Sequence, residues 1–302
     1  MKKCELFDGR YKILKVLGEG GMSTVYLAEN VNLGTLWAIK EINKVSNSKV
    51  DLLVEPNILK KLKHPALPRI FDIIESDNSI YIIEDYIEGI SLDKKLLRSG
   101  KIPEQTVIMW SIQICEVLIY LHNLKPNPII YRDMKPSNIM LTKDNRIKLV
   151  DFGIAREYKM DSRNDTAHIG TRGYAAPEQY GLAQSDVRTD IYGLGVTLYH
   201  LLTGKSPKEA PYEIRPIREI DESLSIGIEH VIDVCTKPNP DHRYQSVEEL
   251  VGDLENIDEI NRGYRKKGIG IKLKLAIMIF LLSIFSYITY LGFIKIIGFF
   301  KN

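Results

Sequence analysis

The amino-acid sequence changes its hydrophobic period once, and this change divides the chain into two unlike parts. Five short β-like runs, separated by Gly, Asn, Asp and Ser, fill the first ninety residues: YKILKVLG, STVYLAEN, LWAIKEIN, RIFDIIES and SIYIIEDY. One helical stretch, at about 52–62, interrupts them. From Ile102 onward the apolar spacing becomes helical, as in TVIMWSIQICEVLIYLHNL. The pattern predicts an α+β chain with a small sheet lobe, a larger helical lobe and a ligand-binding crevice between them.

The distribution of charged residues along the chain limits the kinds of molecule that it is expected to bind. The chain of 302 residues has 41 basic and 39 acidic residues, but its last 42 residues hold eight basic residues and no acid, which leaves a net charge of −6 on residues 1–260. A mildly acidic body argues against a nucleic-acid-binding surface. Three widely spaced cysteines, Cys4, Cys115 and Cys235, lack the spacing of a zinc site or a disulfide framework and are expected to be reduced thiols.

A long uncharged run lies near the C-terminus. Residues 275–294 read LAIMIFLLSIFSYITYLGFI, and twenty such residues form a helix of about 30 Å, the thickness of a bilayer core. A buried core helix is the alternative, but core helices are usually shorter and amphipathic. Six basic residues lie in 262–274, whereas only Lys295 and Lys301 follow the run, so the large N-terminal body is expected to face the cytoplasm. No signal peptide is predicted at the N-terminus.

Two features of the first lobe are suited to binding phosphates. The segment Gly18-Glu19-Gly20-Gly21-Met22-Ser23-Thr24-Val25 lies between two β-runs, where glycines let backbone N–H groups approach an anion. Lys40 ends the apolar strand Trp37-Ala38-Ile39-Lys40, and a buried lysine is costly unless it meets an anion. Glu55 is a candidate partner for Lys40, and an ordinary surface salt bridge is the alternative.

The second lobe carries acids and amides in two motifs. Tyr131-Arg132-Asp133-Met134-Lys135-Pro136-Ser137-Asn138 follows a helix and precedes a strand-like run, and Val150-Asp151-Phe152-Gly153 follows the apolar strand 147–150. The side-chain oxygens of Asn138 and Asp151 are hard donors that suit Mg²⁺ better than zinc.

In this order the motifs resemble those of a protein kinase, of the eukaryotic-like (Hanks-type) Ser/Thr type found in bacteria. The resemblance runs from about Tyr11 to Leu254 and rests on the Gly-rich loop, A-I-K, the helix Glu, R-D-x-x-x-x-N, D-F-G and Ala176-Pro177-Glu178. It implies a bilobal fold with an antiparallel N-lobe sheet and one key helix, followed here by a single transmembrane helix. The expected boundaries are 1–260 for the kinase domain, with lobes at about 11–88 and 89–258, then 261–274 for a basic linker, 275–294 for the span and 295–302 for an extracytoplasmic tail.

The resemblance implies a transfer of the γ-phosphate of Mg·ATP to Ser or Thr hydroxyls of proteins, with Mn²⁺ as an alternative metal. Asp133 would accept the proton of the hydroxyl, Lys135 would lie beside the γ-phosphate, and Asn138 and Asp151 would hold the metal. Lys40, held by Glu55, would bind the α- and β-phosphates. The implied nucleotide-binding residues are Leu17, Gly18, Glu19, Gly20, Gly21, Met22, Ser23, Thr24, Val25, Ala38, Lys40, Met140 and the backbone of Asp85 and Ile87.

Other residues acquire structural roles by the same resemblance. Leu59, Ile70, Tyr131 and Phe152 should form an apolar column between the lobes. Asp190 resembles the acid that anchors the catalytic loop, and Arg243 the arginine that pairs with Glu178.

Four positions depart from the family pattern. Ser23 replaces the third loop glycine, and Tyr131 stands where histidine is commoner. Pro56 directly follows Glu55, so the helix must begin close by, because proline is accepted only in a first turn. Glu84 falls at the back of the adenine pocket, where it must find a partner or take up a proton.

The segment between Asp151 and Glu178 contains Ser162, Thr166 and Thr171. A phosphate on Ser162 or Thr166 could pair with Arg132 and Arg156 and order the segment, although these can also be ordinary loop hydroxyls. Thr171 is expected to be a structural hydroxyl beside Asp133 and Lys135. Expected partners are protein substrates, a second copy as a transient dimer, and membrane lipid, which the cations of 262–274 would also contact.

Two other functions compete with this hypothesis. A pseudokinase would bind without catalysis, but such proteins lose Lys40, Asp133 or Asp151, and all three are present. The other alternative is that the membrane-spanning end is the functional part, as a small pore or an oligomerisation helix, and that the rest of the chain regulates it. A single uncharged span lacks the polar face that a pathway through the membrane needs.

Overall fold

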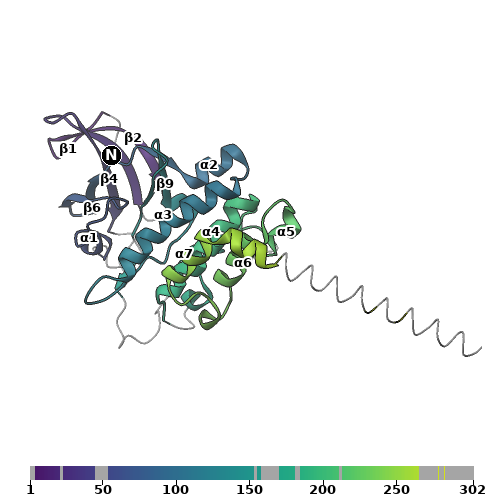
Figure 1. Ribbon diagram of the computed structural model, residues 1–302. Coiled ribbons are helices and arrows are strands. Elements are labelled where there is room, and N and C mark those ends of the chain that lie inside the picture. The colour runs from purple at the N-terminus through teal and green to yellow at the C-terminus, as the bar shows by residue number, and fades with distance from the viewer. Residues whose placement is uncertain are drawn as a thin grey trace, which may run out of the picture.

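The computed structural model describes residues 4–20, 23–44, 54–152, 155–157, 170–180, 184–210 and 213–264, together with Met278 and Leu282. Within these ranges it has a strand-rich part and a helix-rich part (Figure 1). The helix-rich part begins before Ile102, where the sequence predicts the change of period, because α2 already starts at Leu92.

The N-lobe is a curved antiparallel sheet. Its six strands lie in the order β1-β2-β3-β4-β6-β5. Their bounds are β1 Leu6–Phe7, β2 Tyr11–Glu19, β3 Ser23–Asn30, β4 Thr35–Asn43, β5 Ile70–Glu75 and β6 Ser79–Asp85. All five predicted β-runs are therefore strands. Tyr11, Ile13, Tyr26, Ile39 and Ile83 form a buried cluster on one face of this sheet, which leaves the other face for the cleft.

Helix α1 (Val54–Leu59) is shorter than the predicted 52–62. Pro56 is its third residue, which confirms that the proline lies in a first turn. After Leu59 the chain continues in tight turns, in which Lys61 N–H donates to Ile58 O at 3.0 Å and Leu62 N–H to Leu59 O at 3.0 Å. These bonds replace the i to i−4 pattern and end the helix.

The C-lobe is mainly helical, with short strands at its upper edge (Figure 1). Its helices are α2 Leu92–Ser99, α3 Glu104–His122, α4 Val187–Thr203, α5 Ile217–Ile220, α6 Ile226–Cys235 and α7 Val247–Glu255, with 3₁₀ turns Pro136–Asn138, Pro177–Tyr180 and Pro240–His242. Its strands are β7 Gly89–Ser91, β8 Ile129–Ile130, β9 Ile139–Thr142, β10 Ile147–Leu149 and β11 Arg156–Glu157. Helix α2 was not expected, because its apolar positions fill too few turns to show a helical period.

One hydrophobic core connects the two lobes. It contains the buried Leu59, Tyr131 and Phe152, and the half-buried Ile70 packs against it. The rings of Tyr131 and Phe152 meet edge to face, with centroids 5.0 Å apart. All four residues of the predicted apolar column thus belong to one cluster, which ties α1 and β5 to the segments around Tyr131 and Phe152.

None of the helices in the described ranges is long and apolar enough to cross a membrane. The predicted span at 275–294 lies outside these ranges apart from Met278 and Leu282.

Candidate active site

Asp133 lies between three side-chain donors. Lys135 Nζ donates to its Oδ2 at 2.6 Å and Asn138 Nδ2 donates to the same oxygen at 2.9 Å. The Thr171 hydroxyl donates to Oδ1 at 2.8 Å and accepts from Lys135 Nζ at 2.7 Å. The predicted structural role of Thr171 is confirmed. Because an alcohol already donates to Oδ1, this oxygen is placed to take a hydroxyl proton.

The loop that carries Asp133 is anchored by Asp190 of α4. The buried Asp190 carboxylate accepts from Tyr131 N–H at 2.9 Å and from Arg132 N–H at 2.7 Å. His122 Nε2 lies 2.8 Å from the same carboxylate. Arg132 has φ 66°, a left-handed conformation that is costly for a residue with a side chain. The two backbone hydrogen bonds to Asp190 hold the loop in that conformation.

This anchor gives a first prediction. Asp190→Asn keeps the side-chain shape but replaces one acceptor oxygen with a donor that faces backbone N–H groups. We expect the free energy of unfolding to fall by about 3 kcal/mol, since hydrogen bonds to charged groups contribute about 1.5–3 kcal/mol each. Urea denaturation measures this change. Exposed Asp77, in the β5–β6 turn, provides the control Asp77→Asn, which should leave stability unchanged; equal stability of both variants would contradict the anchor.

The Tyr131 hydroxyl has a role that the sequence did not indicate. It donates to Val150 O at 2.6 Å and so links the catalytic loop to the residue before Asp151. Burial, assisted by the Asp133 charge, raises the pKa of Tyr131 well above its ordinary value, so the hydroxyl stays a donor.

Asn138 and Asp151 lie side by side, because Val150 N–H donates to Asn138 O at 3.0 Å. The Asn138 amide nitrogen is used by Asp133, with Nδ2 at 3.1 Å from Asp133 O and 2.9 Å from Oδ2. The amide oxygen accepts only a long hydrogen bond from the Ser137 hydroxyl, at 3.4 Å, among the contacts of the described residues, and it faces away from Asp133. The Asp151 side chain is 46% exposed. In the described residues no three His, Cys, Asp or Glu side chains form a metal cluster, but Mg²⁺ commonly uses one or two protein carboxylates together with phosphate oxygens.

Lys40 points toward Asp151. Its Nζ lies 2.9 Å from Asp151 Oδ1, and its side chain is 9% exposed. The predicted partner Glu55 belongs to α1, but its side chain lies outside the described residues.

The sheet register places the predicted nucleotide-binding residues on one face. Val25 is opposite Lys40, and Ala38 is opposite Glu84. Because alternate residues of a strand share a face, Val25, Ala38 and Lys40 line the roof of the cleft with Glu84 on the next strand. Glu84 is half-buried there, and Met140 of β9 in the C-lobe is half-buried too.

The Gly-rich segment is the β2–β3 hairpin. Gly18 pairs with Val25 and Glu19 with Thr24, while a register shift after Val16 leaves Leu17 without a partner. Gly20 N–H donates to Ser23 O at 2.9 Å and closes the turn. A Cβ at Gly18 would meet no atom within 4 Å, so the space beside the hairpin is open to a ligand. Gly21 and Met22 lie outside the described residues.

The segment that joins the lobes contains Asp85 and Ile87. Asp85 N–H already donates to Arg69 O at 3.1 Å, so this N–H is not available to an adenine. The Asp85 carboxylate accepts from Arg69 Nε at 2.9 Å. Burial raises the pKa of Asp85, but the hydrogen bonds from Arg69 outweigh it and the net pKa is lowered.

The segment after Gly170 is fixed by buried polar contacts. Arg243 pairs with Glu178 through Nη1–Oε1 at 2.8 Å and Nη2–Oε2 at 2.9 Å, which confirms the predicted pair. Gln179 Nε2 donates to Arg132 O at 2.9 Å, and Gln179 Oε1 accepts from Ala176 N–H at 2.9 Å. Sequence reasoning missed Gln179 and His122, because no local pattern marks a partner far away in the chain. Ser162, Thr166 and the Arg156 side chain lie outside the described residues.

A second prediction concerns His200, whose Nδ1 lies 2.5 Å from the Tyr174 hydroxyl. Burial, with a smaller effect of Lys208, lowers the pKa of His200 from 6.5 to about 4. Between these values the unfolded chain binds a proton that the folded chain does not, so stability falls as pH falls from 6.5 to 4. His200→Gln should flatten this dependence in urea denaturation. The exposed His242 offers the control His242→Gln. An unchanged slope in His200→Gln would contradict the assignment.

The structure combines a Gly-rich β2–β3 hairpin, a buried lysine that contacts Asp151, and Asn138 next to Asp133, in a chain with a strand-rich and a helix-rich lobe. The family model for the protein kinase domain matches residues 11–263. The chain therefore belongs to the protein kinase family.

Bacterial Ser/Thr kinases are among its relatives. The serine/threonine-protein kinase PknB of Mycobacterium leprae is 33% identical over 81% of this chain and 42% of its own length. PrkC of Bacillus subtilis is 30% identical over 86% of this chain and 42% of its own length. The "Probable serine/threonine-protein kinase SCO3848" of Streptomyces coelicolor is 33% identical over 84% of this chain and 41% of its own length. The matched region thus covers about two-fifths of these relatives.

Proposed function

We propose that this chain is an ATP-dependent serine/threonine protein kinase. The observation that carries the proposal is the set of contacts of Asp133: its Oδ1 accepts a hydrogen bond from the Thr171 hydroxyl, while Lys135 and Asn138 donate to its Oδ2. The relatives named as serine/threonine-protein kinases support the hydroxyl class of the acceptor. The complete set of polar residues argues against the alternative of a pseudokinase.

In the proposed reaction the residues mainly align the reactants and balance charge. Asp133 Oδ1 orients the acceptor hydroxyl and takes its proton as the oxygen attacks the γ-phosphorus. Lys135, within 2.6 Å of Asp133, balances negative charge on the transferred phosphoryl group. Lys40 binds the α- and β-phosphates, and the β2–β3 hairpin covers them and excludes water.

The donor set fits Mg²⁺, with Mn²⁺ as an alternative, held by the amide oxygen of Asn138 and the carboxylate of Asp151. The bound ion would neutralise phosphate charge. Lys40 would then contact both the phosphates and the Asp151 carboxylate, since its Nζ already lies 2.9 Å from Asp151. The adenine is proposed to lie between Val25 and Ala38 above and Met140 below.

The proposed activity is tested with [γ-³²P]ATP, Mg²⁺ and myelin basic protein as a general acceptor. We expect label in phosphoserine and phosphothreonine after acid hydrolysis and none in phosphotyrosine. Label in phosphotyrosine alone would contradict the acceptor class. Absence of label together with tight Mg·ATP binding would support a pseudokinase. The same incubation without acceptor, followed by phosphopeptide mapping, tests autophosphorylation of Ser162 or Thr166.

We further propose that residues 275–294 anchor the kinase in the cell membrane as a single span, with the kinase domain in the cytoplasm. The support is the uncharged run and the cations of 262–274 that precede it. Tethering would raise the effective concentration of a second copy, so phosphorylation in a transient dimer is expected. Full-length protein should stay in the membrane pellet after alkaline carbonate extraction, whereas residues 1–264 should be released; release of both would contradict the anchor.

A further inference from the structure

Two adjoining cavities form a groove across the junction of the lobes. One, of 440 Å³, lies against residues 86–88 and the β9–β10 turn; the other, of 530 Å³, lies against the end of α1 and the segment that follows it. The two cavities share Arg69, Asp85 and Lys148. We call this hollow the rear groove. Its lining includes none of Lys40, Asp133, Asn138 or Asp151, although it shares Asp85 and Ile87 with the segment predicted to bind the adenine.

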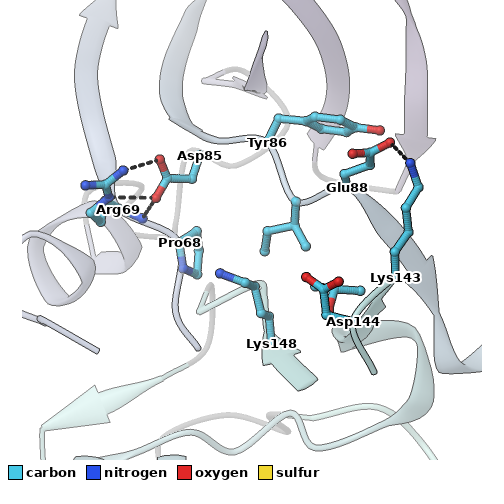
Figure 2. A pocket seen from close by; sticks show the side chains of 10 residues that line it. Pro68, Arg69, Asp85, Tyr86, Glu88, Lys143, Asp144 and Lys148 are labelled. Atoms are coloured by element: carbon cyan, nitrogen blue, oxygen red, sulfur yellow. Dashed lines mark hydrogen bonds and ion pairs between the residues drawn. The ribbon is translucent and has the colours of Figure 1, made fainter. Parts of the chain in front are cut away.

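Most carboxylates of the rear groove are already neutralised. Its acids are Asp85, Glu88 and Asp144. Asp85 pairs with Arg69, at 2.9 Å from Nε to Oδ2, and Glu88 pairs with Lys143, at 2.5 Å from Nζ to Oε1. Figure 2 shows these two pairs on opposite sides of the hollow. Asp144 is the remaining acid.

Three cations of the groove form no close ion pair with a carboxylate in the described part of the chain, although Lys148 lies near enough to Asp85 to help lower the pKa of that carboxyl. They are Lys60, Lys63 and Lys148. Lys60 Nζ contacts the neutral Asn57 Oδ1 at 2.7 Å, and Lys148 Nζ contacts Pro65 O at 2.9 Å. Figure 2 shows Lys148 between the two ion pairs. The groove therefore carries a net positive charge, although residues 1–260 as a whole carry a net charge of −6. An acidic ligand would be attracted to the groove and not to the rest of the surface.

The second cavity also has an apolar floor. Buried Leu59, Leu62 and Leu67 line it, and half-buried Ile70 adjoins them. An apolar floor beneath a cationic rim fits an occupant that has both an apolar side chain and acidic groups.

Both lobes hold the walls of the groove in place. Lys63 N–H donates to the Tyr120 hydroxyl of α3 at 2.8 Å, and Leu149 N–H of β10 donates to Ala66 O at 3.0 Å. The ring of His64 packs against that of Tyr120, with centroids 5.0 Å apart. A groove that is already formed loses less conformational entropy when it binds a ligand.

We propose that the rear groove docks a short acidic segment of a partner protein. The carboxylates of this segment lie against Lys60, Lys63 and Lys148, and one of its apolar side chains packs over Leu62 and Leu67. A planar lipid surface does not reach a concave floor, and the negative body disfavours nucleic acid. Docking at this site does not depend on the proposed catalytic activity, because it can be measured without ATP.

The test measures binding of a fluorescein-labelled peptide, EELDEFEE, by fluorescence anisotropy. The protein is residues 1–264 if this form unfolds cooperatively, and otherwise the full chain in detergent. The salt concentration is about 50 mM, at which surface charges are weakly screened. Lys60→Glu/Lys63→Glu reverses charge on two exposed side chains of the groove. Lys12→Glu/Lys205→Glu reverses the same charge on two exposed lysines of β2 and the loop after α4. A second peptide, EESDESEE, keeps the acids but removes the apolar groups.

We expect saturable binding of the first peptide that weakens about tenfold or more in the groove variant, equivalent to at least about 1.4 kcal/mol. The control variant should bind as wild type, and the second peptide should bind more weakly. Three results would overturn the proposal: no saturation, equal weakening in both variants, or equal affinity for both peptides. Binding of phosphatidylserine vesicles that is lost in the groove variant, without peptide binding, would likewise overturn it in favour of a lipid surface.

Discussion

Asp133→Asn should reduce kcat for phosphoryl transfer by about a thousandfold, within the range of about 10² to 10⁴ for loss of a positioned base. The variant cannot accept the hydroxyl proton, and its side chain presents a donor either to Thr171 or to Lys135, both of which already donate to Asp133. The KM for ATP should change little, because Asp133 is not among the proposed nucleotide-binding residues. Steady-state kinetics on a serine peptide measure both constants.

The control for this variant is Asp77→Asn, an identical chemical change on an exposed residue of the β5–β6 turn. It should retain wild-type kcat. Thermal unfolding of Asp133→Asn separates a loss of chemistry from a loss of fold. If kcat falls less than about tenfold in a folded variant, Asp133 is not the general base.

Arg243→Ala should lower the free energy of unfolding by about 4 kcal/mol, since breaking a buried ion pair costs about 3–5 kcal/mol. The Arg243 and Glu178 side chains are 0% and 5% exposed. Arg243 also donates to the carbonyls of Lys237, Arg188 and Pro238. Removal leaves the Glu178 carboxylate buried beside the Thr189 hydroxyl, which donates to its Oε1 at 2.8 Å. Urea denaturation gives the value.

An exposed ion pair in the same lobe provides the comparison. Arg262 lies 3.8 Å from Glu259, and their side chains are 69% and 71% exposed. Arg262→Ala should change stability by less than about 1 kcal/mol, because exposed pairs contribute little. In Arg243→Met/Glu178→Gln no buried charge is left alone, so part of the loss should be recovered. If Arg243→Ala and Arg262→Ala lower the free energy of unfolding equally, burial of the Arg243–Glu178 pair does not determine its contribution to stability.

The strands of the N-lobe and the order of the site motifs could be predicted because both depend on neighbours in the chain. Short apolar runs bounded by Gly, Asn and Ser mark β3 and β4, and the strand before Asp151 ends where the apolar run ends. The predictions for Asp190 and for Arg243 with Glu178 came from resemblance to a family, and the structure places all three side chains in the expected contacts.

The remaining contacts depend on positions far apart in the chain. Nothing near His122 indicates that its ring meets Asp190, 68 residues away. The Tyr131 hydroxyl finds Val150 O only because the catalytic loop and β10 are adjacent in the fold. Helix α2 has only eight residues, so its two buried leucines, Leu92 and Leu96, show too little of a helical period. The rear groove forms where three separate segments meet, and no single pattern predicts it.

The central claim is that Mg²⁺ and ATP bind together in the cleft at Asn138, Asp151 and Lys40. Isothermal titration calorimetry with a non-hydrolysable ATP analogue tests it most directly, with wild type and Asp151→Asn titrated in the presence and absence of Mg²⁺. We expect Mg²⁺ to tighten binding to wild type at least about tenfold, or about 1.4 kcal/mol, and Asp151→Asn to lose most of this gain. No heat of binding to wild type, or the same affinity with and without Mg²⁺, would contradict it.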